Sequence, residues 1–322
     1  MEKNADEKSL IASTTKIMTA LVVCEQCNVL DRVKIPKEAV GIEGSSLYLK
    51  EGEVLTVQEL LYGLMLHSGN DAAVALAIYC GGTVEGFVEM MNDKARLLGM
   101  TGTHYANPNG LDHPENYSTA RDLATLAAYA MENPIFAKTA ATKNITIGSR
   151  PLKNHNKLLW MLDGADGVKT GFTKAAGRIL VSSAQRQGRR LIAVTLHDPN
   201  DWQDHIALLE DGFSNYSIRQ ILSEGEQVGT VEIAGGTEKE IPVLAAEDFF
   251  YAMAPGETAE VILPEPGFAY APVVLGGAAG TAHICIGGKS VGTIPVVYGR
   301  TVELERPRKY SLWQRWFGGT ER

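Results

Sequence analysis

The spacing of apolar residues changes near residue 140 and separates a helical region from a strand-rich one. Before that point apolar residues recur at helical intervals, which predicts helices at residues 17–23, 60–66, 71–78, 83–98 and 118–133. After it the pattern alternates, which predicts strands at residues 144–147, 167–170, 179–184 and 191–196, and then a helix at residues 202–216. Helices packed on an antiparallel sheet form an α+β domain, which we expect to span residues 1–222.

Turn and cap residues locate several helix ends. Thr56 and Glu59 have the spacing of a capping box, which predicts the start of the helix at residues 60–66. Asp71 can cap the next helix. Ser68 and Asn70 are therefore expected in a tight turn between two helices, a position where functional residues are often found.

Residues 223–304 have a different pattern, in which short alternating runs are separated by glycine and proline. They predict strands at residues 228–233, 240–243, 259–263, 282–286 and 290–297. This region contains no cluster of reactive side chains and no aromatic platform for stacking sugars. We therefore expect a small all-β sandwich that serves as a support or spacer.

Residues 305–322 form a tail with an amphipathic pattern. At helical spacing its large apolar residues share one face; they are Tyr310, Leu312, Trp313, Trp316 and Phe317. Basic residues lie beside two tryptophans, which is typical of a helix that lies on an anionic membrane. We expect residues 308–317 to contact a membrane surface; a helix packed on its own protein is the alternative.

Composition narrows the class of protein. The chain has 322 residues and a net charge of −8, which argues against a nucleic-acid partner. No apolar run reaches the roughly 18 residues that a membrane-spanning helix needs. Cys24 and Cys27 form an isolated C-x-x-C pair without the further ligands of a zinc site, so no metal or other cofactor is expected.

Ser13 and Lys16 are the first candidate catalytic pair. On a helix their spacing places both side chains on one face, about 5–6 Å apart at Cβ. A serine hydroxyl needs a nearby base, and a lysine can serve only if burial or another cation lowers its pKa. The apolar run after Lys16 supplies the burial, but Ser-x-x-Lys alone is a common pattern.

Two further triplets make the pattern specific. Ser68-Gly69-Asn70 and Lys169-Thr170-Gly171 follow in order. Ser-x-x-Lys, Ser-x-Asn and Lys-Thr-Gly together are the signature of penicillin-binding proteins and class A β-lactamases. With its β-rich second domain and amphipathic tail, the chain resembles the low-molecular-mass penicillin-binding proteins of the serine D-alanyl-D-alanine carboxypeptidase family. Its fold would then be a DD-peptidase/β-lactamase-like antiparallel sheet flanked by helices.

The resemblance implies a role for each motif residue in acyl transfer. Ser13 would attack the peptide carbonyl and form an acyl-enzyme, and Lys16 would take its proton. Ser68 would relay a proton to the leaving D-alanine. Asn70 would hold Lys16 and the substrate amide.

The Lys-Thr-Gly strand would orient the substrate. Lys169 would keep Lys16 uncharged by repulsion, and Thr170 would bind the terminal carboxylate. The backbone N–H of Phe172, just after Gly171, would form an oxyanion hole with the N–H of Ser13.

The resemblance also implies partners and location. Members of the family act outside the cytoplasm, remove the terminal D-alanine from peptidoglycan stem pentapeptides and are acylated by β-lactams such as penicillin. The expected location is therefore the outer face of the cytoplasmic membrane.

Two features depart from the family pattern. The polar N-terminus lacks the apolar core of an export signal and the first strands of the sheet. Residues 2–4 resemble the end of the second strand, so we expect the sheet to have an exposed edge. His155 stands where some relatives carry an arginine, which leaves the contact to the substrate carboxylate open.

Two other functions are compatible with the sequence. A serine β-lactamase on the same fold would need a glutamate that positions the deacylating water, and Glu115 has no context that recommends it. A catalytically inactive scaffold at the membrane surface would keep the fold without an assembled site.

Overall fold

The computed structural model describes residues 1–263 and 268–305. The chain divides into two compact units between Phe213 and Ser214. This boundary lies before the one expected at residue 222, because strand β10 (Ser217–Leu222) pairs with β13 (Phe249–Met253) of the second unit. The predicted membrane-binding segment, residues 308–317, lies outside the described residues.

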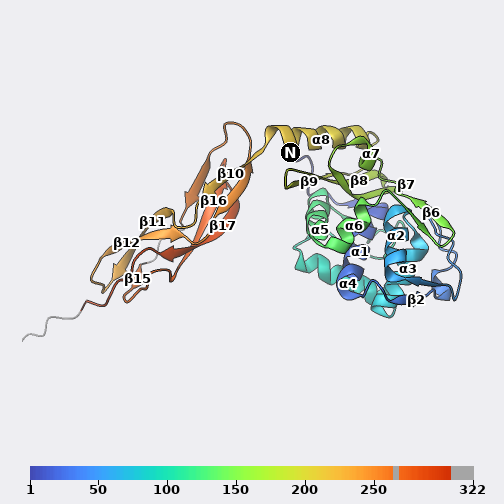
Figure 1. The fold of residues 1–322 in the computed structure, drawn as a ribbon, viewed down its shortest axis with the longest axis horizontal. Coiled ribbons are helices and arrows are strands. Elements are labelled where there is room, and N and C mark those ends of the chain that lie inside the picture. Colours follow the sequence, from blue (N-terminus) through green and yellow to red (C-terminus); the bar gives the residue numbers. More distant parts are fainter. Residues whose placement is uncertain (264–267, 306–322) are drawn as a thin grey trace, which may run out of the picture. The chain divides into compact units, whose positions relative to one another are not determined.

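The first unit is built on a three-stranded antiparallel sheet in the order β7-β8-β9 (Figure 1). The strands are β7 (Ala165–Thr173), β8 (Gly177–Arg186) and β9 (Arg189–Thr195). Val181 of β8 joins the core formed with the helices, whereas Ala184 packs with Leu209 of the last helix on the other face. Alternation along β8 thus buries both faces of the sheet.

Helices cover both faces of this sheet, with α8 on one side and the other long helices on the opposite side (Figure 1). They are α1 (Thr15–Gln26), α2 (Val57–Leu66), α3 (Asn70–Gly81), α4 (Val84–Leu97), α5 (Ala120–Glu132), α6 (Pro134–Ala141), α7 (Leu158–Met161) and α8 (Asp201–Asn215). Short hairpins complete the unit: β2 (Arg32–Lys34) with β3 (Val54–Thr56), and β5 (Asn144–Ile147) with β6 (Arg150–Lys153). The α+β prediction is therefore confirmed.

One of the helix starts predicted from the sequence is confirmed, another is capped differently, and the start of a further helix was not predicted. Thr56 and Glu59 form the predicted capping box. Asp71 does not cap α3, which begins at Asn70; its carboxylate instead accepts hydrogen bonds from the loop at residues 46–49. The prediction also missed α6, because Asn133-Pro134, which ends α5, also starts α6 with Asn133 as its cap.

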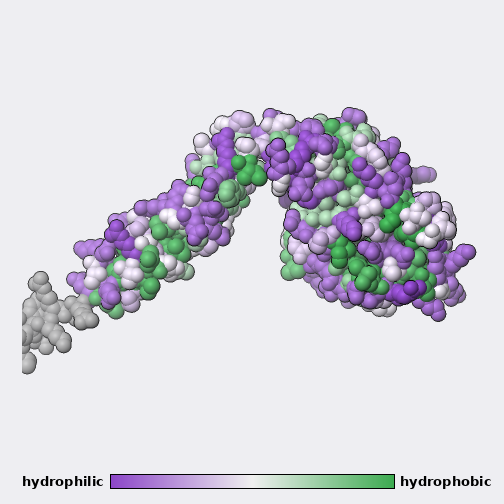
Figure 2. Space-filling view, viewed as in Figure 1, coloured by the Kyte–Doolittle hydropathy of each residue, from purple (hydrophilic) through white to green (hydrophobic). Residues whose placement is uncertain are grey.

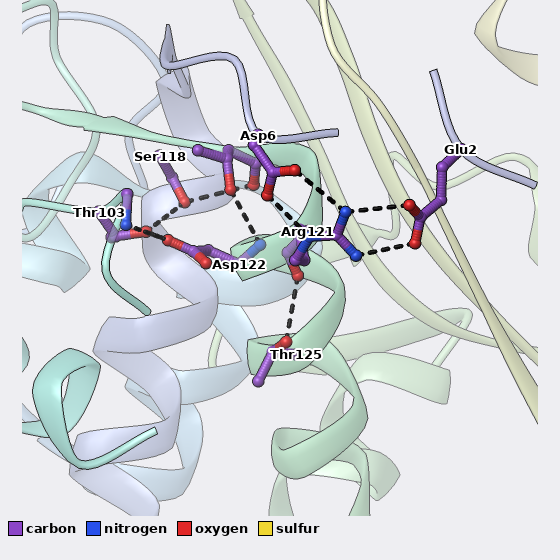
Figure 3. Close-up of polar contacts among 9 residues, drawn as sticks. Glu2, Asp6, Thr103, Ser118, Arg121, Asp122 and Thr125 are labelled. Atoms are coloured by element: carbon purple, nitrogen blue, oxygen red, sulfur yellow. Dashed lines mark hydrogen bonds and ion pairs between the residues drawn. The ribbon is translucent and has the colours of Figure 1, made fainter. Parts of the chain in front are cut away.

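The N-terminal segment is tied to α5 rather than to the main sheet. Residues 2–4 are not a strand, contrary to expectation, and β1 (Ser9–Leu10) pairs with β4 (Tyr117–Ser118). Arg121 donates hydrogen bonds to both carboxylate oxygens of Glu2 and of Asp6 (Figure 3). Among the described strands β9 pairs only with β8, so it forms an edge of the sheet.

The second unit is all-β, as predicted. Its main sheet has six strands in the order β14-β16-β17-β12-β11-β15. These are β11 (Gln227–Ala234), β12 (Glu240–Ala245), β14 (Ala259–Ile262), β15 (Ala269–Tyr270), β16 (Ala278–Ile286) and β17 (Lys289–Tyr298). Val231, Ile284 and Ile294 belong to its separate apolar core.

The surface is largely hydrophilic on the face shown in Figure 2, where apolar residues gather only in small patches. Within the described residues, no single helix has the length and apolar character to cross a bilayer. The pair α3 and α4 reaches that length only in combination and bends by 84°.

Candidate active site

The site forms where the turn before α1, the α2–α3 turn and the edge of β7 meet. Ser13 lies in a short 3₁₀ turn (Ala12–Thr14) rather than in α1 itself, which begins at Thr15. Residues i and i+3 still stack in such a turn. The Lys16 Nζ and the Ser13 Oγ are therefore 3.1 Å apart, as the spacing predicts.

Lys16 is fully buried and has a defined set of partners. Its Nζ donates to Asn70 Oδ1 at 2.6 Å and to the backbone oxygen of Asn109. Burial lowers the pKa of Lys16 well below its usual value, Lys169 lowers it further and Asp71 opposes the shift. Nζ also donates to the Ser13 Oγ, so the buried amine contacts Ser13, Asn70 and Asn109.

The α2–α3 turn contributes Ser68 and Asn70. Ser68 has a φ of 61°, and its buried Oγ has no hydrogen-bond partner within the described part of the chain. Asn70 is held in place because its Nδ2 donates to the backbone oxygen of Glu43 at 2.5 Å and its backbone N–H donates to Ser45 at 2.7 Å. The Ser68 hydroxyl is thus available to a ligand beside a fixed amide.

Strand β7 passes close to the nucleophile. A Cβ on Gly171 would lie 3.3 Å from the Ser13 nitrogen and 3.2 Å from the Ile11 oxygen, so only glycine lets the strand approach this turn without displacing it. Lys169 is 1% exposed, and burial lowers its pKa to about 7. Phe172, next along the strand, is 65% exposed at the mouth of the site.

The structure brings all eight predicted site residues together. Ser13, Ser68, Thr170, Gly171 and Phe172 line one cavity of about 970 Å³. The other three are buried, and they are Lys16, Asn70 and Lys169. Glu115, the residue considered for a β-lactamase, is not among the residues that line this cavity.

Asn109 accepts a hydrogen bond from Lys16 with its backbone carbonyl and was not predicted as a site residue. The only sequence signal was its position in the turn at residues 107–111. Every residue has a backbone carbonyl, so the identity of a side chain does not show that its carbonyl accepts a hydrogen bond. Asp71 was misassigned, since its partners at residues 46–49 are distant in sequence.

The segment at residues 154–156 is fixed beside the cavity by hydrogen bonds from two asparagine side chains. The side chains of Asn154 and Asn156 donate to backbone oxygens, including that of Gly167 at the start of β7. His155 faces His67 instead, with ring centroids 5.2 Å apart, and both line the cavity. Burial, Lys169 and His67 lower the pKa of His155 to about 4, so its ring is neutral at neutral pH.

The sequence matches known proteins of the family that the three motifs indicate. Residues 1–200 match the family model described as D-alanyl-D-alanine carboxypeptidase, and residues 216–304 match that of the penicillin-binding protein 5 C-terminal domain. The D-alanyl-D-alanine carboxypeptidase DacC of Escherichia coli (strain K12) is 34% identical, over 94% of this chain and 80% of its own length. DacF of Bacillus subtilis (strain 168), with the same description, is 33% identical over 79% of this chain and 69% of its own.

Solved structures show the same relationship, in one case over 94% of the chain and in another over 66%. Penicillin binding protein 5 from Haemophilus influenzae is similar with a TM-score of 0.79 at 30% identity, covering 94% of this chain and 92% of that one. The Streptomyces K15 DD-transpeptidase is similar with a TM-score of 0.64 at 37% identity, covering 66% of this chain and 91% of that one. The chain therefore belongs to the low-molecular-mass penicillin-binding proteins, the family of serine D-alanyl-D-alanine carboxypeptidases.

Proposed function

We propose that the chain removes the terminal D-alanine from peptidoglycan stem pentapeptides through an acyl-enzyme on Ser13. The observation that carries the proposal is the buried Lys16 amine, 3.1 Å from the Ser13 hydroxyl. A lysine deprived of water and close to a second lysine can accept a proton near neutral pH.

Acylation would begin when Ser13 Oγ attacks the carbonyl carbon of the penultimate D-alanine while Lys16 takes the hydroxyl proton. The developing oxyanion would be bound by the backbone N–H groups of Ser13 and Phe172. Each such donor contributes roughly 3–4 kcal/mol to transition-state stabilisation. The close approach of Gly171 to the Ser13 nitrogen supports this pairing.

Collapse of the tetrahedral intermediate breaks the C–N bond and releases D-alanine. Ser68, which lines the cavity, would relay the proton from Lys16 to the leaving amine. Asn70 would bind the substrate amide, and Thr170 would bind the terminal carboxylate. Water would then hydrolyse the ester, with Lys16 again accepting a proton. β-Lactams would acylate Ser13 through the same first step.

The activity can be tested with a synthetic tripeptide that ends in D-Ala-D-Ala. We expect release of one D-alanine per peptide, measured with a D-amino-acid oxidase assay, because the contacts of Ser13 and Lys16 support acyl transfer. A matched peptide that ends in L-Ala-D-Ala, which would also release D-alanine, is the control and should give little signal. If the purified chain releases no alanine from the D-Ala-D-Ala peptide, the proposed reaction is wrong.

We also propose that the enzyme works outside the cytoplasm on the membrane surface, held by residues 308–317. Two tryptophans and nearby basic residues in this segment support binding to anionic lipid. In sedimentation with anionic vesicles we expect the full chain to bind and the Trp313→Ala/Trp316→Ala variant to lose most binding. The Ser311→Ala/Gln314→Ala variant, altered on the polar face, should bind like the wild type. Equal binding by both variants would contradict the assignment.

A further inference from the structure

The chain's four cysteines are all free thiols, and none of them lines the active-site cavity. In the sequence Cys24 and Cys27 look like a pair, because only two residues separate them. The fold pairs Cys27 with Cys80 instead. The two thiols share a hydrogen bond, which Cys80 donates and Cys27 accepts.

Cys27 and Cys80 lie at the C-terminal ends of two neighbouring helices. Cys27 follows the last residue of α1, and Cys80 lies in the last turn of α3. The two helices pack against each other, and both thiols flank the same apolar core. A second contact lies beside them, since the Tyr79 hydroxyl donates to Asp31 Oδ2 at 2.8 Å. A disulfide requires cysteines on closely spaced segments of backbone, and these contacts supply that spacing.

Cys24 is a poorer partner for Cys27, although it is closer in the sequence. Its side chain belongs to the buried core, and burial raises the pKa of its thiol to about 12. The backbone changes from helical to extended at Cys27 (φ −118°, ψ 147°), so Cys27 does not continue the helical row of Cys24. The remaining cysteine, Cys285, belongs to the second unit.

Cys27 has the properties of an attacking thiol. It is half-buried between the exposed residues Gln26 and Asn28, so a small oxidant can reach it. The hydrogen bond from Cys80 lowers the pKa of Cys27, whereas burial and the charge of Asp31 oppose the shift. The thiolate is the reactive form of cysteine, so a stabilised anion favours attack on an external disulfide.

We propose that Cys27 and Cys80 form a disulfide bond when the chain meets an oxidant that is itself a disulfide, and that this bond cross-links α1 to α3. The Cys27 thiolate attacks the external disulfide, whose S–S bond breaks and releases one thiol. The Cys80 thiol then loses its proton and attacks the Cys27 sulfur, which releases the second thiol. Two electrons and two protons pass from the protein to the oxidant, so the external disulfide is reduced to two thiols.

The cross-link would reinforce the contact between Lys16 and Asn70. Lys16 lies in the first turn of α1, and Asn70 is the first residue of α3; a hydrogen bond of 2.6 Å joins their side chains. A disulfide at the other ends of the same helices closes a long loop, which restricts the unfolded chain more than the folded one. We therefore expect oxidation to raise the unfolding temperature of the first unit.

The test incubates the full chain with oxidised glutathione and, in parallel, with reduced glutathione. Free thiols are then blocked with N-ethylmaleimide under denaturing conditions and counted by intact mass. We expect four labels on the reduced chain, one for each cysteine, and two on the oxidised chain, because one disulfide consumes two thiols. A protease that cleaves after glutamate separates Cys24 from Cys27 at Glu25, and the linked peptides should contain Cys27 and Cys80.

Cys24→Ala is the matched control. It removes the other cysteine of the C-x-x-C pair and should still form the link between Cys27 and Cys80. Cys80→Ala should form no link within the chain. Four labels on the oxidised wild type, a link between Cys24 and Cys27, or an intrachain link that persists in Cys80→Ala would overturn the proposal.

Thermal unfolding tests whether the bond stabilises the packing of α1 against α3. The melting temperature of the oxidised wild type should exceed that of the reduced chain by about 4–16 °C, the shift expected for a disulfide in a unit of this size. The wild type is compared with itself, so this result does not depend on the folding of a variant. In Cys80→Ala the two treatments should give the same melting temperature. An unchanged melting temperature in a wild-type chain that holds the bond would contradict the cross-linking effect.

Discussion

Replacement of Ser13 by alanine is expected to abolish covalent labelling by penicillin. The wild type should gain the mass of one penicillin per chain, on the peptide that contains Ser13, and Ser13→Ala should gain none. The substitution removes only the hydroxyl, and Lys16 keeps Asn70 and Asn109 as partners, so the fold should persist. Mass spectrometry of the intact chain, followed by peptide mapping, measures both outcomes.

Ser9→Ala is the control for this experiment. Ser9 lies nearby in the sequence on β1, and its hydroxyl bonds only to the adjacent Leu10 oxygen among the contacts described. This variant should be labelled like the wild type. Labelling of Ser13→Ala at the wild-type level would exclude Ser13 as the nucleophile, and an adduct mapped to Ser68 would assign the reaction to a different serine of the cavity.

The second large effect is expected for Lys16→Met, which keeps an unbranched side chain one atom shorter than lysine but removes the base. Acylation by penicillin should slow roughly 10²–10⁴-fold, the usual contribution of general-base catalysis. Stopped-flow or time-resolved mass spectrometry would measure the rate. Lys174→Met is the control, because Lys174 is exposed just after β7 and lies outside the cavity lining. Acylation of Lys16→Met at the wild-type rate would rule out Lys16 as the base.

The pH dependence of the wild type should report the same lysines. Lys16 is a base only without its proton, so kcat/KM should rise with pH through the lowered pKa of Lys16. In the free enzyme the charge of Lys169, which we expect to help orient the substrate, is lost as the pH rises through about 7. The expected profile is bell-shaped, and its rising limb should disappear in Lys16→Met. A rising limb that persists in this variant would assign the titration to another group.

Local pattern was enough to predict much of the fold and to select the eight candidate site residues, which the fold brings together. Helical and alternating periodicity located the main helices and strands of the first unit and most strands of the second. The capping box at Thr56 and Glu59 was correct because both partners lie within one turn. The starts of α3 and α6 were missed, since Asp71 is held by a distant loop and Asn133 ends one helix while it caps the next.

The sequence by itself determined the chemistry: a Ser-x-x-Lys pair, a Ser-x-Asn turn and a Lys-Thr-Gly strand, each readable because its residues are neighbours in the chain. Only the tertiary structure decided how these pieces act together. It buries Lys16 and Lys169, and it places the Asn109 carbonyl where it accepts a hydrogen bond from the Lys16 amine. Burial and long-range contacts depend on segments far apart in sequence, so no local pattern could have specified them.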